Sequence, residues 1–349
     1  DTGAISSAVH SRSGVWSPDG KYFAIGGVNG SDKPVIVYSW ENGQLNFLDE
    51  YTLTSCWNCQ SISWSPDGKY LAASPYTGST ALIIFKFDGS KLSLIRSVLD
   101  VESPGFTSAE SFDWSADGKY LFVGFKTDSE NWTSGILKVF SINNDSAEEL
   151  KYLEKSLSGG AATVNVHPNL PIVATMSNGT PQVQFWQFDD TGREKLTEIE
   201  GCNKWTGSKS LRRASWSSDG RYVSLVGLST VAGDGSACWV YEFSNGTLTE
   251  RARFNHGSNL LDTSWHPSGK YLLISGNDDG GGINVKVLKF DGNNLTNITD
   301  CEIDVGTSYS AKWHPSGNYL GLLSLEDTLI KCYKFENESV SLAGTYNHG

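Results

Sequence analysis

A repeated segment of about fifty residues constrains the fold of this chain more than any other feature of its sequence. Each copy places a tryptophan, or its equivalent, before a tight turn and an apolar run, as in Trp64-Ser-Pro-Asp-Gly-Lys-Tyr-Leu-Ala. The anchoring positions are Trp16, Trp64, Trp114, Val166, Trp216, Trp265 and Trp313, and they are spaced by 48, 50, 52, 50, 49 and 48 residues. So constant a period over 349 residues indicates seven equivalent structural units.

Each repeat predicts four short strands. The first strand ends at the tryptophan, and the Ser-Pro-Asp-Gly tetrad then forms a turn in which Pro66 presets φ and Gly68 takes a positive φ. An apolar run forms the second strand, and an alternating third strand is joined to a fourth by a polar turn. No segment has the 3.6-residue period of a helix. The expected fold is therefore all-β: a seven-bladed β-propeller with four antiparallel strands per blade and no helical domain.

The whole chain, residues 1–349, is expected to form this single domain. The predicted blades cover approximately residues 10–53, 60–100, 109–157, 162–200, 210–254, 260–303 and 308–347. Too few residues precede the first strand to supply a further outer strand. We therefore expect that the two ends of the chain share no blade, and that side-chain packing closes the ring. The alternative is that residues 1–8 run along an outer edge as a partial strand.

The W-S-P-D-G-K-Y-L-A unit resembles the repeat of WD-repeat and TolB-type propellers, and the H-P-S-G-K-Y-L variant resembles lactonase-like seven-bladed propellers. The resemblance covers nearly the whole chain and implies the propeller fold, an architecture that carries many different activities. The chain departs from typical WD repeats because no repeat has the Trp-Asp dipeptide or the Gly-His pair. The fourth repeat also has Leu170 where the others have a turn glycine.

The charge balance narrows the range of partners. The chain has 27 basic and 39 acidic residues, a net charge of −12, whereas nucleic acids and anionic membranes favour clusters of Lys and Arg. No apolar run approaches the roughly 18 residues that span a bilayer. We therefore expect no nucleic acid and no membrane span, and look instead to protein partners, self-assembly or a small molecule.

The six cysteines predict disulfides. Cys202 and Cys301 lie in equivalent connections after a fourth strand, and Cys238 and Cys332 lie on the third strand of the blade that follows each. We expect the pairs Cys202–Cys238 and Cys301–Cys332. Cys56 and Cys59 would close a small local ring. Free thiols are the alternative for that pair, and a metal or redox site is a weaker one because the C-x-x-C lacks both a βαβ context and a second ligand pair.

Glycosylation sequons support an oxidising compartment. Eight N-x-S/T triplets occur, at Asn29, Asn131, Asn144, Asn178, Asn245, Asn294, Asn297 and Asn337. All fall in predicted loops, turns or outer strands, where a glycan could project. Asparagine is also an ordinary turn residue, so that such triplets arise without any modification. Together with the cysteines, the sequons favour an extracellular protein secreted from a eukaryotic cell.

Catalytic signatures are absent from the sequence. There is no G-x-S-x-G, H-E-x-x-H or phosphate-binding loop. His167, His266 and His314 take the position that holds serine in other repeats, so we interpret them as local hydrogen-bonding residues. No cofactor is expected, although two loops rich in oxygen ligands, 231–235 and 277–282, leave calcium open.

Four charged residues stand out among the small polar residues that precede the tryptophan positions. They are Asp113, Arg213, Asp262 and Lys312. Because the innermost strands of a propeller converge on its axis, these side chains would form either a structural ion network or a polar ligand pocket. The resemblance to lactonase-like propellers implies an acid or base and an anion-binding Arg in such a pocket.

Three functions follow from these patterns. The first is a secreted, glycosylated, non-enzymatic propeller that serves as a binding or assembly module, such as a subunit of an extracellular filament or layer. The alternative is a lactonase-like hydrolase of small lactones or esters. The third is an intracellular WD-repeat scaffold in which the cysteines are reduced.

Overall fold

The computed structural model describes most of the chain. The described residues are 13–26, 35–41, 43–52, 58–76, 80–99, 108–126, 134–150, 153–157, 159, 161–177, 182–191, 195–202, 211–228, 235, 237–324 and 329–347. Among the sequence predictions, Cys56, Asn29, Asn131, Asn178 and nearly all of loop 231–235 lie outside them, as do residues 1–8 and their proposed edge strand.

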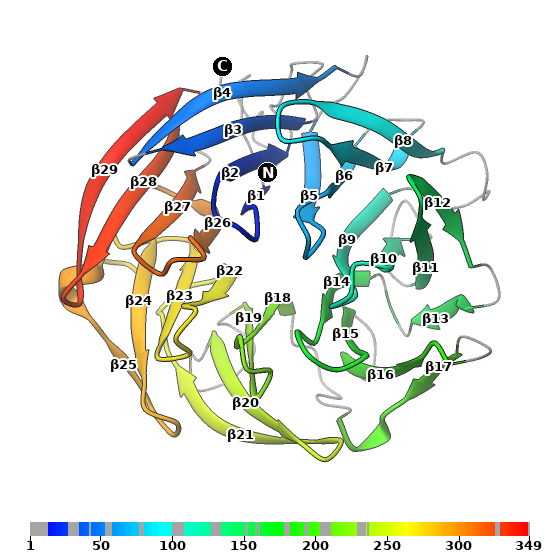
Figure 1. The fold of residues 1–349 in the computed structure, drawn as a ribbon. Coiled ribbons are helices and arrows are strands. Elements are labelled where there is room, and N and C mark those ends of the chain that lie inside the picture. Colours follow the sequence, from blue (N-terminus) through cyan, green and yellow to red (C-terminus); the bar gives the residue numbers. More distant parts are fainter. Residues whose placement is uncertain are drawn as a thin grey trace, which may run out of the picture.

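Seven antiparallel sheets are arranged in a ring around a central axis (Figure 1), which confirms the predicted seven-bladed propeller. The first blade is β1 (Ser13–Trp16), β2 (Tyr22–Gly26), β3 (Val35–Glu41) and β4 (Gln44–Tyr51), and the second is β5 (Asn58–Trp64), β6 (Tyr70–Tyr76), β7 (Thr80–Phe87) and β8 (Leu92–Leu99). The third is β9 (Ser108–Trp114), β10 (Tyr120–Lys126), β11 (Gly135–Asn143) and β12 (Ser146–Glu149), with a short extra strand β13 (Lys155–Leu157) paired to β11. The fourth is β14 (Ala161–Val166), β15 (Ile172–Ser177), β16 (Val183–Asp189) and β17 (Lys195–Glu198).

The remaining three blades repeat the same order. The fifth blade is β18 (Leu211–Trp216), β19 (Tyr222–Gly227), β20 (Cys238–Ser244) and β21 (Thr247–Phe254). The sixth is β22 (Leu260–Trp265), β23 (Tyr271–Gly276), β24 (Val285–Phe290) and β25 (Leu295–Asn297), and the seventh is β26 (Ser308–Trp313), β27 (Tyr319–Ser324), β28 (Leu329–Glu336) and β29 (Ser339–Asn347). Two short 3₁₀ turns, η3 (Glu200–Cys202) and η5 (Thr299–Cys301), follow β17 and β25.

The turn between the first two strands of a blade is fixed by its own side chains. In the second blade the Ser65 hydroxyl donates to Asp67 Oδ1 at 2.7 Å and accepts the Tyr70 amide at 2.9 Å. Gly68 has a φ of 71°, which an L side chain adopts only with strain. The sequence S-P-D-G therefore specifies the turn locally, before any contact between blades forms.

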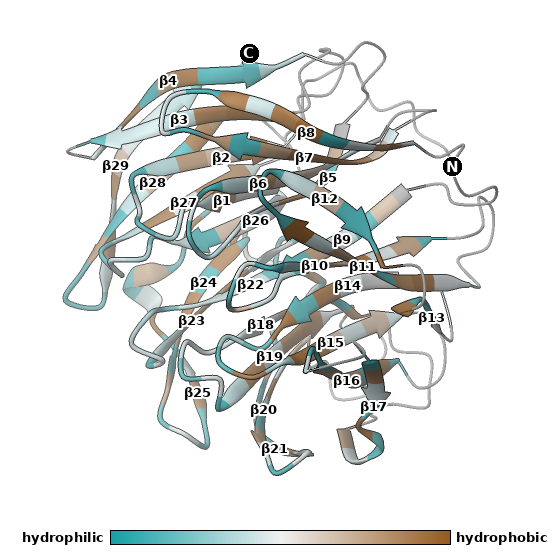
Figure 2. Ribbon diagram, turned by 45° about the vertical axis from the view of Figure 1, so that its right-hand side comes forward, coloured by the Kyte–Doolittle hydropathy of each residue, from teal (hydrophilic) through white to brown (hydrophobic). Residues whose placement is uncertain are grey.

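The hydrophobic core lies between the blades. Seven clusters of buried apolar side chains each join the facing sides of two neighbouring sheets. Figure 2 shows apolar colour along the sheets and polar colour at many of the connecting turns. Each blade thus buries both faces only because it has a neighbour on either side, which is why the ring has to close.

Over the described strands the ring closes without a shared blade, as predicted from the position of the first strand. Among the described strands, β1–β4 and β26–β29 form separate sheets. One apolar cluster, including Trp16, Phe23, Leu323 and Ile330, joins them. The Tyr346 hydroxyl also donates to the carbonyl of Gly43 at 2.9 Å across this seam.

The two predicted inter-blade disulfides are absent from the structure. Cys238, Cys301 and Cys332 are buried free thiols, so Cys202–Cys238 and Cys301–Cys332 do not form. The reason is the alternation of side chains along a strand. Cys202 packs between the fourth and fifth blades, on the side that Trp239 faces, whereas Cys238 points to the other side of its sheet, toward the sixth blade. Cys301 and Cys332 are separated in the same way.

Five of the eight sequons fall on described residues. Asn144, Asn245, Asn294 and Asn337 are exposed in turns between the third and fourth strands of their blades. Asn297 differs because it is half-buried at the end of β25, where its side-chain amide donates to Glu302 Oε1 at 2.7 Å. The sequence pattern alone could not separate these two environments.

Candidate functional site

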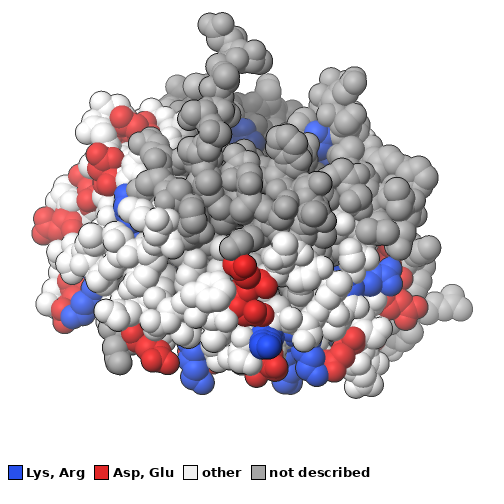
Figure 3. All heavy atoms as spheres, turned by 90° about the horizontal axis from the view of Figure 1, so that it is seen from above, with Lys and Arg blue, Asp and Glu red and all other residues white. Residues whose placement is uncertain are grey.

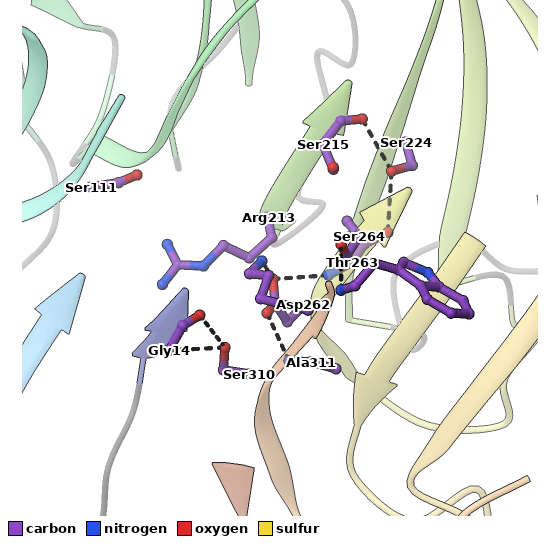
Figure 4. Close-up of polar contacts among 12 residues, drawn as sticks. Gly14, Ser111, Arg213, Ser215, Ser224, Asp262, Thr263, Ser264, Ser310 and Ala311 are labelled. Carbon is purple, nitrogen blue, oxygen red and sulfur yellow. Dashed lines mark hydrogen bonds and ion pairs between the residues drawn. The ribbon is translucent and has the colours of Figure 1, made fainter. Parts of the chain in front are cut away.

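The seven innermost strands, which include β1, β9, β18, β22 and β26, surround a cavity of about 150 Å³ on the propeller axis. Its walls are mostly small polar residues, and all four predicted charged residues, Asp113, Arg213, Asp262 and Lys312, line it. Figure 4 shows part of this region. The structure therefore brings together residues that lie up to 199 positions apart in the sequence, because each occupies one of the last three positions before a tryptophan anchor.

The buried Asp262 and the partly exposed Lys312 form an ion pair between the sixth and seventh blades. Lys312 Nζ lies 2.7 Å from Asp262 Oδ1, which also accepts the Thr263 amide at 2.9 Å. The second carboxylate oxygen accepts the Ala311 amide at 3.0 Å. Asp262 is thus already paired with a cation, which makes this carboxylate a structural holder of Lys312.

Asp113 has a different environment. Its two oxygens accept backbone amides from Trp114 at 2.9 Å and from Val166, in the next blade, at 2.8 Å. Burial raises the pKa of Asp113 to about 6, although these two hydrogen bonds and the charge of Lys312 act in the opposite direction. A carboxyl with a pKa near neutrality is suited to accept and release a proton at physiological pH.

Arg213 supplies a positive charge that forms no ion pair with any carboxylate of the described residues. Its guanidinium has one long hydrogen bond, from Nη2 to the carbonyl of Gln60 at 3.5 Å. In Figure 4 the side chain extends beyond Asp262 into the space between the inner strands. An uncompensated guanidinium facing a polar cavity is suited to bind a carboxylate, a phosphate or a developing oxyanion.

The three repeat histidines lie outside this cavity and connect neighbouring blades. Nε2 of His167, His266 and His314 contacts the carbonyl of the turn glycine in the following blade, at 2.9, 3.1 and 2.9 Å. Nδ1 accepts backbone amides of the histidine's own turn, for example that of Ser268 at 3.0 Å from His266. Nε2 is therefore the protonated nitrogen that donates. The interpretation of these residues as hydrogen-bonding rather than catalytic agrees with this geometry.

In the described calcium candidate, loop 277–282, the carboxylates are satisfied by backbone amides of the loop and by Lys286 of β24. Asp278 Oδ1 accepts the amides of Gly280 and Gly282 at 2.7 Å, and Asp279 Oδ2 pairs with Lys286 at 2.9 Å. Across the described part of the chain, no three His, Cys, Asp or Glu side chains cluster in a way that could hold a metal ion. Calcium binding stays a prediction from the sequence.

Comparison with known proteins agrees with the architecture. No protein-family model and no curated sequence matches this chain. Among solved structures, a putative 6-phosphogluconolactonase of Bacteroides uniformis superposes with a TM-score of 0.74, at 15% identity over 92% of this chain and 94% of its own. The chain is a seven-bladed β-propeller. The periplasmic gluconolactonase of Pseudomonas aeruginosa gives a TM-score of 0.73 at 16% identity, covering 97% of this chain and 95% of its own.

A propeller in the mitotic checkpoint complex is also similar to this chain, with a TM-score of 0.67 and 14% identity over 95% of this chain and 91% of that one. This similarity supports the WD-repeat-like character of the fold. Propellers often mediate interactions between proteins. Within the described residues, no helix combines the length and apolar character that a membrane crossing needs.

The first functional prediction, a non-enzymatic binding or assembly module, is wrong on these comparisons. Neighbours that share the fold over nearly their full length are named lactonases. They favour the alternative drawn from the H-P-S-G-K-Y-L repeats. The prediction failed because it took the absence of catalytic motifs as the absence of a reactive site. A propeller brings its axial residues together from separate blades, and a local sequence motif cannot reveal such a group.

Proposed function

We propose that the protein is a lactonase-like hydrolase that opens a small cyclic ester in its axial cavity. The observation that supports this most directly is the cavity's charge arrangement: Asp113, with a pKa raised to about 6, lines the same polar space as Arg213, which pairs with none of the described carboxylates. A base and an anion-stabilising cation are the two groups that hydrolysis of an ester by water needs.

In the proposed reaction, Asp113 takes a proton from a water molecule as that water attacks the lactone carbonyl carbon. The carbonyl oxygen becomes negatively charged and faces the guanidinium of Arg213. The ring C–O bond then breaks, and the leaving alkoxide takes up a proton, so that the product is an open-chain hydroxy acid. Lys312, held by Asp262, adds positive charge near Asp113.

The size and lining of the cavity support a small polar substrate. Its volume of about 150 Å³ is similar to that of an engineered cavity that admits benzene, a single six-membered ring. Hydroxyls of serine and threonine from several blades line it, including Ser63, Ser111 and Thr163. Such donors and acceptors suit the hydroxyl groups of a sugar lactone better than an apolar ring.

The test is hydrolysis of a panel of small sugar lactones by the purified protein. Asp113→Asn and Arg213→Ala should each lower kcat/KM, the former by roughly 10²–10⁴-fold if it removes the general base. Arg212→Ala is the matched control, since Arg212 is the exposed neighbour on the same strand. Absence of turnover by the unmodified protein on every lactone, or equal loss in the Arg212 variant, would reject the proposal.

We further propose that the protein is exported and glycosylated. The four exposed turn sequons, Asn144, Asn245, Asn294 and Asn337, support this. The test is the mass of tryptic peptides from protein secreted by eukaryotic cells, before and after enzymatic removal of glycans. Asn297 is an internal control, because its bonded, half-buried amide should remain unmodified. Four unmodified turn asparagines would contradict export.

A further inference from the structure

The space between the third and fourth blades contains a second cavity, on the side of the ring where the turns between first and second strands lie. Six blades end their innermost strand in tryptophan, and the fourth ends it in Val166. The cavity, of about 150 Å³, is lined by Val166 itself and by turn residues of both blades, among them Asp117 and Asn169. It therefore marks the one repeat in which the anchor side chain is small.

The other blades show what normally fills this position. In the second blade, Trp64 lies against Phe87 of its own blade and Tyr22 of the preceding blade, with ring centroids 5.1 and 6.4 Å apart. The sixth blade repeats this arrangement at 5.4 and 6.3 Å. In these two blades the indole ring of the anchor is thus the third member of an aromatic trio between neighbouring blades.

In the fourth blade the other two members of the trio are present. Tyr120 of the preceding blade and Phe188 keep an edge-to-face contact with centroids 4.7 Å apart. Phe122 occupies a position that is alanine in the first two blades, at Ala24 and Ala72, and contacts Phe188 with centroids 5.2 Å apart. This larger side chain takes up part of the missing indole volume, but the cavity beside Val166 remains.

The mouth of the cavity combines an apolar edge with negative charge. Leu170, which replaces the turn glycine of other blades, is 45% exposed there, one of few large apolar side chains with such exposure among the described residues. Asp190 is exposed at the rim and forms no ion pair within the described part of the chain, although its charge acts on Lys119, which pairs with Asp117 at 2.9 Å. Apolar walls with a carboxylate at the rim complement an aromatic ring that carries a positive charge.

We propose that this cavity, the Val166 pocket, binds a small arylalkylamine: a planar aromatic ring that packs beside Val166 against Tyr120 and Phe188, with its ammonium group at Asp190. The ring takes the place of the anchor indole of the other six blades. This site is separate from the axial cavity, so that the proposal does not depend on lactone hydrolysis.

The probe is tryptamine, titrated into the full-length protein and followed by calorimetry or ligand-observed NMR, with indole-3-acetate as its anionic counterpart. We expect tryptamine to bind more tightly than indole-3-acetate. Asp190→Asn should weaken tryptamine roughly two- to fivefold, the effect of one exposed ion pair, and leave the affinity for uncharged indole unchanged. Equal affinity for both charged probes, or no tryptamine binding at its solubility limit, would overturn the proposal.

A variant in which a new side chain fills the Val166 pocket, called the refilled variant, tests where tryptamine binds. Val166→Trp supplies the missing ring and should abolish tryptamine binding while raising the melting temperature. If Phe122 leaves too little room for the new side chain, the double variant Phe122→Ala/Val166→Trp restores the residue pair found in the first two blades and should have both effects. Unchanged tryptamine affinity in a folded refilled variant would place any binding elsewhere and reject the Val166 pocket.

Discussion

Single residues of the repeat explain how neighbouring blades hold their positions. A serine after the anchor, as at Ser65, satisfies only its own turn, whereas a histidine there reaches the next blade as well. His266 is fixed as the neutral tautomer with Nε2 protonated, because Nδ1 accepts the Ser268 amide. Exchange between Ser and His in the repeat is therefore a choice between a local and an inter-blade hydrogen bond.

This tautomer makes the stability of the ring depend on pH. Burial lowers the pKa of His266 below its ordinary value of about 6.5, as it does for His167 and His314. The native state then binds fewer protons than the unfolded state between the two pKa values. The free energy of unfolding should thus fall as pH drops below about 6.5 and level off under the folded pKa.

Urea unfolding of the protein and of His266→Ser at pH 7.5 and pH 5 checks this. The variant should lose about 1–2 kcal/mol at pH 7.5, where Nε2 donates to Gly317 and Nδ1 accepts the Ser268 amide, and less at pH 5, where a proton on Nδ1 prevents it from accepting. Asp113 also makes the free energy of unfolding depend on pH, in the opposite direction, because its pKa is raised. This contribution is the same in both proteins, so it cancels in the difference between them. The same loss at both pH values would show that protonation of His266 does not contribute.

At Asp113 the pKa predicts the pH profile of the proposed reaction. A carboxylate base with a pKa of about 6 gives kcat/KM a rise with pH that is centred near 6. Since the charge of Lys312 lowers the pKa of Asp113, Lys312→Met should move that midpoint upward. The measurement is the pH–rate profile of both proteins on one lactone. A midpoint that stays fixed or moves down would exclude Asp113 as the titrating group.

At the scale of elements, the turn between the first two strands is one of the places where a blade can contact its neighbour. Gly20 and Gly269 have nearly the same φ, 72° and 69°. A Cβ at Gly20 would lie 2.6 Å from the imidazole of His314, whereas at Gly269 no atom lies within 4 Å. The same substitution at the two turns therefore separates backbone strain from contact between blades.

Gly269→Ala should cost about 1–2 kcal/mol through the positive φ alone, and Gly20→Ala should cost clearly more. Chemical unfolding of both variants measures the difference. His314→Ser, which installs the serine of other repeats, should relieve the excess in Gly20→Ala. Equal losses of stability in the two single variants would show that the imidazole of His314 moves aside at no cost in free energy.

The elements themselves could be predicted from the sequence because each is specified locally. The anchor, the S-P-D-G turn and the apolar run fix the first two strands, and the period fixes their number. The direction in which Cys238 points depends on the strand register, and a shift of one residue turns the side chain to the other face of the sheet. The disulfide prediction failed at this point. The grouping of Asp113 with Arg213 was open to prediction, since the axis is shared by all blades. The Val166 cavity followed only from the volumes of side chains on two blades.

At the scale of the whole molecule, charged side chains of both signs share the side drawn in Figure 3. Lys and Arg are interspersed there with Asp and Glu over the described residues. The thiols, by contrast, are interior. Burial raises the pKa of Cys301 and of Cys332 to about 12, and raises the pKa of Cys238 as well.

These three thiols should resist iodoacetamide in the folded protein, since the reacting species is the thiolate. In guanidinium chloride without reductant they should be alkylated in full. Peptide mass spectrometry after each treatment checks both statements. Blocked Cys301 and Cys332 in the denatured, unreduced protein would show that oxidation joins them after all, against the packing in the structure.

The seam between β1–β4 and β26–β29 has a consequence for biosynthesis. In a ring whose first and last segments contribute to one common sheet, that sheet stays incomplete until translation ends. Each sheet of the described strands is continuous in sequence, so its strands can pair as soon as its roughly fifty residues have left the ribosome. The first and seventh sheets then meet through side chains such as Trp16 and Leu323, with no strand exchanged between them among the described residues.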